Sequence, residues 1–258
     1  MNKARETIIA LSIVHNGDWN KIFECIKNKT LLEDRVVDNA MSIGYDCLTL
    51  IDAEYPEKVK QKSKPPFVIY CDGNRDLLIS NETKHFGVLN DTLASNYAIE
   101  STFKIVKDLI DERVIVIPYS SKKSGEFIQK VIKNGGKVIA ILDKGIGELN
   151  CDNLELYREL KKNHLIISTY PQNVAKKTLN TEITAIQLFS SICDEILIGG
   201  VCDRTPQSSS IGFGLANGST IYCIPFPMGS NFVNNRLIRE GAVLVETAND
   251  ILEESWRR

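Results

Sequence analysis

The sequence predicts an α/β fold in which a small N-terminal helical module precedes a doubly wound, mostly parallel sheet. Two observations lead to this expectation. Six short apolar segments alternate with helical patterns after Asn81. These segments are apolar at nearly every position, which is typical of strands that are buried on both faces of a parallel sheet.

Residues 1–45 have helical periodicity, with apolar residues at steps of three and four, and Gly17 and Gly44 fall where helices can end. We interpret residues 1–45 as the helical module and residues 46–258 as the main domain. The module either packs on the main domain or forms a contact unit for nucleic acid or protein.

The stretch YPEKVKQKSKPPFVIYCDGN, which begins at Tyr55, connects a strand at 47–51 to a strand at 67–71. Pro56 can start a short helix because the first helical residue needs no N–H partner. Pro65 and Pro66 exclude helix and favour an extended entry into the second strand. The Asp-Gly-Asn sequence that follows predicts a turn.

The remaining elements alternate regularly, as in a Rossmann-like sheet. A further helix, strand and helix are expected after residue 234. Strands are expected at 86–89, 113–118, 136–142, 164–168, 194–201 and 219–225, with helices near 95–111, 122–134, 152–162, 179–192 and 209–217.

The composition excludes several classes of protein. Apolar residues make up 43% and charged residues 25%, which is typical of globular chains rather than disordered ones. No apolar run approaches the roughly 20 residues of a membrane helix, and the N-terminal apolar run resembles a helix more than a signal peptide. We therefore expect a cytoplasmic protein without a membrane partner. Because the net charge is −2, any nucleic-acid binding depends on a local basic patch.

Catalytic and metal-binding patterns are absent from the sequence. The seven cysteines contain no C-x-x-C pair, which argues against structural zinc and a disulfide framework and favours buried thiols. His85 and His164 stand at strand starts, opposite the edge where ligands bind, and His15 lies in the helical module. No phosphate loop or dinucleotide fingerprint occurs. We expect no enzyme activity, no metal and no cofactor.

Ligands of open parallel sheets bind at the carboxyl ends of the strands, so the loops after each strand are the candidate sites. Hydroxyls and backbone N–H groups after the 194–201 strand can face an anion together, or they merely cap a helix. A second loop offers two lysines beside serines, which either bind phosphate or form a solvated face. The two groups are Thr205, Gln207, Ser208, Ser209 and Ser210, and Ser120, Ser121, Lys122 and Lys123.

The order of several motifs resembles the DNA-processing protein A (DprA/Smf) family from about Gly44 to the C-terminus. The motifs are the Tyr-Pro, Pro-Pro and Asp-Gly-Asn elements, NGGKVIAIL at 134–142, ISTYP at 167–171, NGSTIYCIP at 217–225 and NRLIREGAVLVE at 235–246. The resemblance implies a cytoplasmic protein that binds single-stranded DNA, forms a homodimer and helps to load a recombinase during natural transformation.

The chain departs from the family at the polar positions that the resemblance assigns to the ligand. Asn90 and Thr92 stand where the family has Gly and Arg in the first loop, and they are our candidates there. The other departures are at Ile117-Pro118 (Ser-Gly), Lys122-Lys123-Ser124 (Gly-Ile-Asp), Ile128 (His), Thr169 (Glu), Ala185-Ile186-Gln187 (Arg-Asn-Arg) and Thr205-Pro206-Gln207 (Ser-Gly-Ser).

Three functions remain open at this point. The first is a non-catalytic DprA-like protein that binds single-stranded DNA in DNA uptake or recombination, with Lys122, Lys123, Lys176 and Lys177 in place of the family's arginines. The second is a sensor or scaffold that binds a nucleotide-like small molecule around Ser208 to Gly212. The third is a pseudo-subunit that pairs with an intact homologue.

Overall fold

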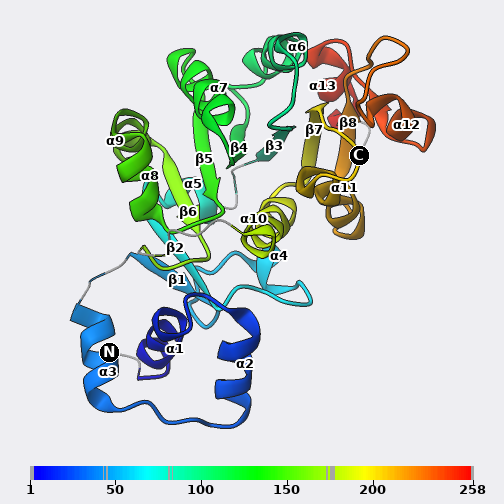
Figure 1. Ribbon diagram of the computed structural model, residues 1–258. Coiled ribbons are helices and arrows are strands. Elements are labelled where there is room, and N and C mark those ends of the chain that lie inside the picture. The colour runs from blue at the N-terminus through cyan, green and yellow to red at the C-terminus, as the bar shows by residue number, and fades with distance from the viewer. Residues whose placement is uncertain are drawn as a thin grey trace.

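The computed structural model describes residues 3–42, 44, 46–80, 82, 84–172, 174 and 178–256, with side chains up to residue 253 (Figure 1). Its strands form one nine-stranded sheet in the order β1-β2-β6-β5-β4-β3-β7-β8-β9. The strands are β1 (Cys47–Thr49), β2 (Val68–Gly73), β3 (His85–Asn90), β4 (Val114–Tyr119), β5 (Lys137–Leu142), β6 (Leu165–Ser168), β7 (Glu195–Gly200), β8 (Thr220–Cys223) and β9 (Val243–Leu244).

The strands from β6 to β9 along the sheet are parallel, whereas β2 pairs antiparallel with β6 and with β1. This arrangement confirms the doubly wound, mostly parallel sheet. The chain leaves β3 toward β4 on one side and leaves β7 toward β8 on the other. The strand order therefore reverses between β3 and β7, which are neighbours.

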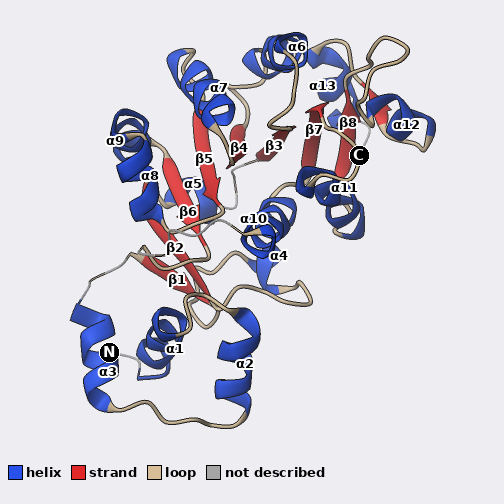
Figure 2. Ribbon diagram, viewed as in Figure 1, coloured by secondary structure: helices blue, strands red, loops and turns tan. Residues whose placement is uncertain are grey.

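Helices cover both faces of the sheet (Figure 2). One apolar core lies under α6, α7, α8, α9 and α13, and the other under α4, α5, α10, α11 and α12. The helices are α1 (Lys3–Val14), α2 (Trp19–Lys27), α3 (Asp34–Ser42), α4 (Glu57–Lys60), α5 (Asp76–Ile79), α6 (Asn96–Lys107), α7 (Lys122–Lys133), α8 (Ile146–Asp152), α9 (Leu154–Asn163), α10 (Leu179–Ile192), α11 (Pro206–Ala216), α12 (Asn234–Arg239) and α13 (Ala248–Trp256).

The helices α11 and α8 show how packing and capping change the sequence-based expectation. Helix α11 begins at Pro206 rather than near residue 209, because Thr205 caps it and proline suits the first helical position. Helix α8 was not expected, since Gly145 precedes it and Gly147 lies within it, yet Ile146 and Leu149 are buried one turn apart and fix it to the sheet.

The N-terminal helices pack beside the strands β1 and β2, where Figure 1 shows them as a separate blue group. The buried hydroxyl of Tyr70 donates to Ser12 Oγ at 2.9 Å. Trp19 Nε1 donates to the Pro65 carbonyl at 2.8 Å, and its ring stacks on Phe67 at 5.4 Å. Of the two roles open for this module, the structure therefore shows packing on the main sheet.

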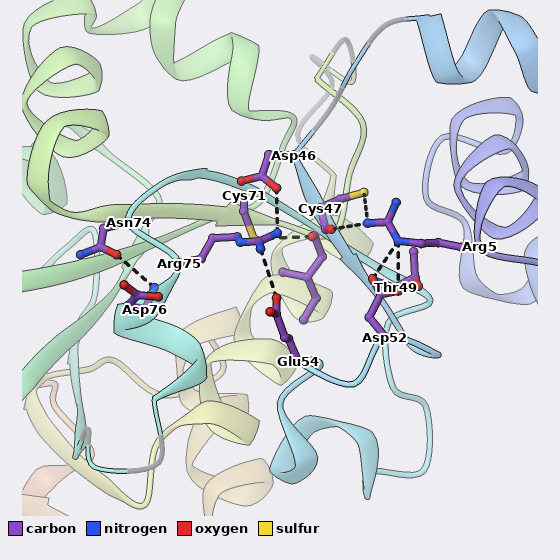
Figure 3. A network of polar contacts seen from close by, with 11 residues as sticks. Arg5, Asp46, Cys47, Thr49, Asp52, Glu54, Cys71, Asn74, Arg75 and Asp76 are labelled. Atoms are coloured by element: carbon purple, nitrogen blue, oxygen red, sulfur yellow. Dashed lines mark hydrogen bonds and ion pairs between the residues drawn. The ribbon is translucent and has the colours of Figure 1, made fainter. Parts of the chain in front are cut away.

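Two arginines join helices to the first strand, as Figure 3 shows. Arg5 of α1 donates to Asp52 Oδ1 at 3.0 Å and to the Cys47 carbonyl at 2.9 Å. Arg75, which precedes α5, forms ion pairs with Asp46 at 2.9 Å and Glu54 at 3.1 Å. These contacts fix the antiparallel edge of the sheet, and the network has a structural rather than a ligand-binding role.

Four of the seven cysteines, Cys47, Cys71, Cys193 and Cys223, are buried as expected, and Cys151 is exposed. Burial raises the pKa of Cys47 to about 11 and that of Cys223 to about 12. Both thiols are therefore protonated at neutral pH. They act as small apolar side chains rather than nucleophiles.

His164 precedes β6 at the amino end of the sheet, where it is buried, and its Nδ1 accepts from Val138 N at 3.3 Å. Burial, followed by the charge of Lys137, lowers its pKa from 6.5 to about 4. Between these values the unfolded chain binds a proton that the folded chain does not. Stability should therefore fall as the pH drops from 6.5 to 4, by about 3 kcal/mol from this group.

Urea unfolding across this pH range checks the prediction. The variant His164→Gln keeps an acceptor near Val138 N and should show a flatter profile than the wild type. His85, whose pKa is also lowered by burial, is present in both proteins. The difference between the profiles therefore belongs to His164, and parallel profiles would contradict the prediction.

Candidate functional site

The reversal of strand order between β3 and β7 creates the expected binding position at the carboxyl ends of these strands. The helices that follow them, α6 and α11, lie on opposite faces of the sheet. The two strands stay paired up to Asn90 and Gly200, with a register shift after Leu89. The loops at residues 91–95 and 201–205 therefore begin side by side at this end of the sheet.

Asn90 joins β3 and β7 at their carboxyl ends. Its Oδ1 accepts from Gly200 N at 3.1 Å and from Thr102 Oγ1 at 3.3 Å. A Cβ on Gly199 would lie 2.1 Å from Thr102 Oγ1 and 2.2 Å from Asn90 Oδ1, so only glycine fits there. The side chain of Asn90, a candidate ligand group in the sequence analysis, therefore forms its hydrogen bonds through Oδ1 within the protein.

A small cavity lies beside Asn90, where β3 and β4 separate. Strand β4 pairs with β3 only as far as Val116 but with β5 as far as Tyr119. The cavity holds about 20 Å³, which is room for roughly one water molecule, so a larger ligand requires its walls to move. Its lining includes Asn90, Asp91, Pro118, Ser121, Lys123 and Ser124.

Asp91 is a group at this cavity that the sequence analysis missed. The residue is only 3% exposed. Its Oδ1 accepts from Leu93 N at 3.0 Å and from Thr92 Oγ1 at 3.2 Å, so the candidate Thr92 supports Asp91. Its Oδ2 has no hydrogen-bond partner in the described part of the chain. A buried carboxylate oxygen disfavours a phosphate inside the cavity and favours an N–H donor.

The start of α7 supplies one cation to the cavity. Lys123 Nζ donates to the Ala94 carbonyl at 2.9 Å, and no carboxylate forms an ion pair with it among the described residues. The side chain of Lys122 is 91% exposed, and its Nζ lies 3.9 Å from Glu126 Oε1. Ser121 caps the helix in a reciprocal arrangement with Ser124, and Ser120 N donates to the same Ser124 hydroxyl at 3.1 Å.

The hydroxyl-rich group at α11 fits the helix-cap alternative. Thr205 Oγ1 donates to the Cys202 carbonyl at 3.0 Å and accepts from Ser208 N at 3.3 Å. Ser208 and the buried Ser210 donate to carbonyls one turn earlier, at 2.7 and 2.6 Å. Gln207 is buried and Ser209 is exposed. The structure does not place any of these five candidates in the lining of the small cavity.

Arg204, at the start of the same loop, is a second residue that sequence reasoning passed over. It is exposed and has a positive φ of 58°, which is uncommon for a residue other than glycine. Its neighbour Asp203 pairs with Arg236 at 3.2 Å. Its position directly before the capping Thr205 was the sequence signal that could have identified Arg204. The residue places a cation near the carboxyl end of β7.

Several positions that are polar in the family belong to the core here. Ile128 of α7 and Ala185 and Ile186 of α10 are buried apolar residues, and Thr169 is buried at the end of β6. The side chains now add to packing instead of facing a ligand. Lys176 and Lys177, two of the four lysines proposed as replacements, lie outside the described residues.

A larger cavity of about 560 Å³ lies away from the switch between β3 and β7. It separates α2 and the connector before β2 from the start of α10. Its lining includes Trp19, Lys64, Tyr170 and Thr181. The Trp19 ring stacks on Phe23 at 5.0 Å and on Phe67 at 5.4 Å, and Lys64 Nζ lies 5.1 Å from its centroid. Trp19 thus has packing partners of its own within the protein.

Comparison with known proteins identifies the family. The family model of DNA recombination-mediator protein A matches residues 46–255. The chain belongs to this family. The DNA processing protein DprA of Streptococcus pneumoniae (strain ATCC BAA-255 / R6) is 23% identical over 214 residues, which are 81% of this chain and 74% of that protein.

Two solved structures of DNA processing protein A share the fold. The S. pneumoniae structure has a TM-score of 0.76 at 19% identity and covers 97% of this chain and 92% of its own. The Helicobacter pylori structure, which describes a single-stranded DNA binding mode, has a TM-score of 0.69 at 17% identity and covers 83% and 97%. The DprA-like fold expected from the sequence is thereby confirmed.

The described residues contain no group of three or more His, Cys, Asp or Glu side chains that could hold a metal ion. Across the same part of the chain, no helix has both the length and the apolarity to span a membrane.

Proposed function

We propose that this DprA-family protein binds single-stranded DNA at the carboxyl ends of β3, β4 and β7, without catalysing a reaction, in recombination or DNA uptake. Membership of the family carries the proposal. The H. pylori relative binds single-stranded DNA. The position of the site is supported by the reversal of strand order, where open parallel sheets bind ligands.

Cations at this edge support phosphate contacts on its surface. Lys122 and Lys123 follow β4 and Arg204 follows β7, the two strands that flank β3. Lys123 is not neutralised by an ion pair in the described part of the chain. Each phosphate that such a cation contacts releases counterions, so affinity falls as salt rises. Because the small cavity contains a carboxylate, the phosphates belong outside it.

A non-catalytic role is supported by the positions of the titratable groups. His85 and His164 lie at the amino ends of their strands, far from the proposed site. Burial and the charge of Asp91 raise the pKa of Cys202, the cysteine that follows β7. Among the described residues at this edge, neither a histidine nor an activated thiol is therefore in place. A homodimer and a recombinase remain the proposed partners.

The unpaired Oδ2 of Asp91 favours a second candidate function, recognition of a small nucleotide-like ligand. A base edge with N–H donors would satisfy this oxygen, whereas free phosphate would not. Calorimetric titration with nucleotides separates this candidate from DNA binding. Micromolar nucleotide binding that Asp91→Asn abolishes, together with no affinity for oligonucleotides, would favour the second candidate.

Replacing Lys123 by glutamine tests the proposed site. Fluorescence anisotropy with a labelled oligonucleotide across a salt series should show weaker binding and a log–log salt slope reduced by about one, since one phosphate contact is lost. Lys107→Gln is the matched control, because Lys107 is an exposed lysine at the opposite end of α6. If both variants weaken binding equally, the effect comes from the change in net charge, which would contradict the proposed site.

A further inference from the structure

Three aromatic rings form a cluster at the carboxyl ends of β3, β7 and β8, here called the aromatic ledge: Tyr97, Phe226 and Phe232. Tyr97 lies in the first turn of α6, and its side chain is 59% exposed. Phe226 and Phe232 belong to the loop before α12, drawn in orange in Figure 1. Tyr97 thus presents an exposed aromatic ring beside the candidate binding site.

Ring contacts and two hydrogen bonds fix the position of the aromatic ledge. The Tyr97 and Phe226 rings meet edge to face, with centroids 5.8 Å apart, and Phe226 lies 4.6 Å from Phe232. The Asn235 side chain fixes the backbone of Phe226. Its Oδ1 accepts from Phe226 N at 2.9 Å, and its Nδ2 donates to the Phe226 carbonyl at 2.7 Å. A ring on such a rigid support loses little conformational entropy when another ring stacks on it.

Cations stand at both ends of the ledge. Lys123 donates to the carbonyl of Ala94, three residues before Tyr97. At the other end, Phe232 forms a β-bridge with Cys202, two residues before the exposed Arg204. Phe232 also lies within van der Waals range of a Cβ built on Gly200, so the ledge adjoins the end of β7. The apolar ring face is thus flanked by positive charge.

We infer that Tyr97 is a stacking platform for a base of single-stranded nucleic acid, with Lys123 and Arg204 contacting the flanking phosphates. The inference rests on the proposed function and extends it to a residue that the family comparison does not assign. An exposed aromatic face between cations is the arrangement that single strands bind, because every base has a π-face and every link carries a negative charge. Stacking also attracts single-stranded DNA without the arginines that the family has and this chain lacks.

Anisotropy with an oligothymidylate tests this role through four proteins: the wild type, Tyr97→Ala, Tyr97→Phe and Phe23→Ala. Tyr97→Ala should weaken binding roughly tenfold with an unchanged salt slope, because stacking releases no counterions. Tyr97→Phe should keep the wild-type affinity. Phe23→Ala is the matched control, since Phe23 is an aromatic side chain of α2 that is 41% exposed.

Arg204→Asn tests the flanking contact in the same assay. Asparagine tolerates the positive φ of this position, so the backbone is preserved. This variant should lower the salt slope by about one, in contrast to Tyr97→Ala. A direct readout of stacking is Tyr97→Trp, whose indole fluorescence should be quenched when the oligonucleotide is added.

The outcomes distinguish a failure of the proposed function from a failure of the stacking role alone. A wild type that binds no oligonucleotide at low salt overturns the proposed function and the stacking role with it. A wild type that binds as tightly as Tyr97→Ala overturns the stacking role alone. If Tyr97→Ala changes only the oligomeric state in light scattering, the ledge contacts a second copy of the chain instead, which also overturns it.

Discussion

Replacing Gly199 by alanine should lower the free energy of unfolding by about 3 kcal/mol or more and remove DNA binding. The new Cβ would lie 2.1 Å from Thr102 Oγ1 and 2.2 Å from Asn90 Oδ1. Thr102 is fully buried and Asn90 Oδ1 accepts from Gly200 N, so both groups are held in place. The strands β3 and β7 must then separate where the proposed site is built. Urea unfolding and anisotropy measure the two effects.

Gly212→Ala is the matched control for this substitution. No atom lies within 4 Å of a Cβ built on Gly212, which is inside α11. Alanine there should be neutral or stabilise by about 0.5 to 1 kcal/mol, because it favours helix. Combining Gly199→Ala with Asn90→Gly and Thr102→Ala should restore part of the lost stability. Equal stabilities of the two single variants would contradict the steric explanation.

Replacing Asn234 by alanine should cost about 2 kcal/mol or more of stability. Its fully buried Nδ2 lies 2.9, 3.0 and 2.9 Å from the carbonyls of Ile198, Gly199 and Ile224. Without this donor the end of β7 and the loop that carries Phe226 lose their common anchor. Asn234 Oδ1, which has no hydrogen-bond partner among the described residues, is removed too, and this offsets part of the loss. Denaturant unfolding measures the net effect.

The control is Asn217→Ala at the end of α11, where the side chain makes one bond of 2.9 Å to the Ser190 carbonyl. Its cost should be about 1 kcal/mol. DNA affinity should fall for Asn234→Ala and not for Asn217→Ala, because only the former anchors the aromatic ledge. A smaller loss for Asn234→Ala than for Asn217→Ala would show that the anchor is not important.

The strands were predictable because their burial on two faces makes them apolar along their whole length. The segment at 136–142, for example, became β5 almost residue for residue. The short helix α8 was not predictable, because Gly145 before it and Gly147 within it argue against helix, and packing on the sheet stabilises it. Local sequence preference and tertiary contacts disagree there, and the contacts decide.

The candidate site was only partly predictable, because hydroxyl and amide groups have both local and ligand-binding uses. Asn90 was correctly placed at the carboxyl end of β3, but its Oδ1 bonds to Gly200 N. Ser121 and Thr205 begin helices and are used as caps. Conversely, the burial of Asp91 and the exposure of Tyr97 depend on elements distant in sequence, so no local pattern reveals them.

Hydrogen exchange with and without a single-stranded oligonucleotide tests the central claim most directly. Our account predicts slower exchange in the three segments that meet at the carboxyl ends of β3, β4 and β7, namely residues 91–97, 119–125 and 201–206. The larger cavity between α2 and α10 is the competing surface. Protection confined to that cavity, or no protection anywhere, would contradict our account.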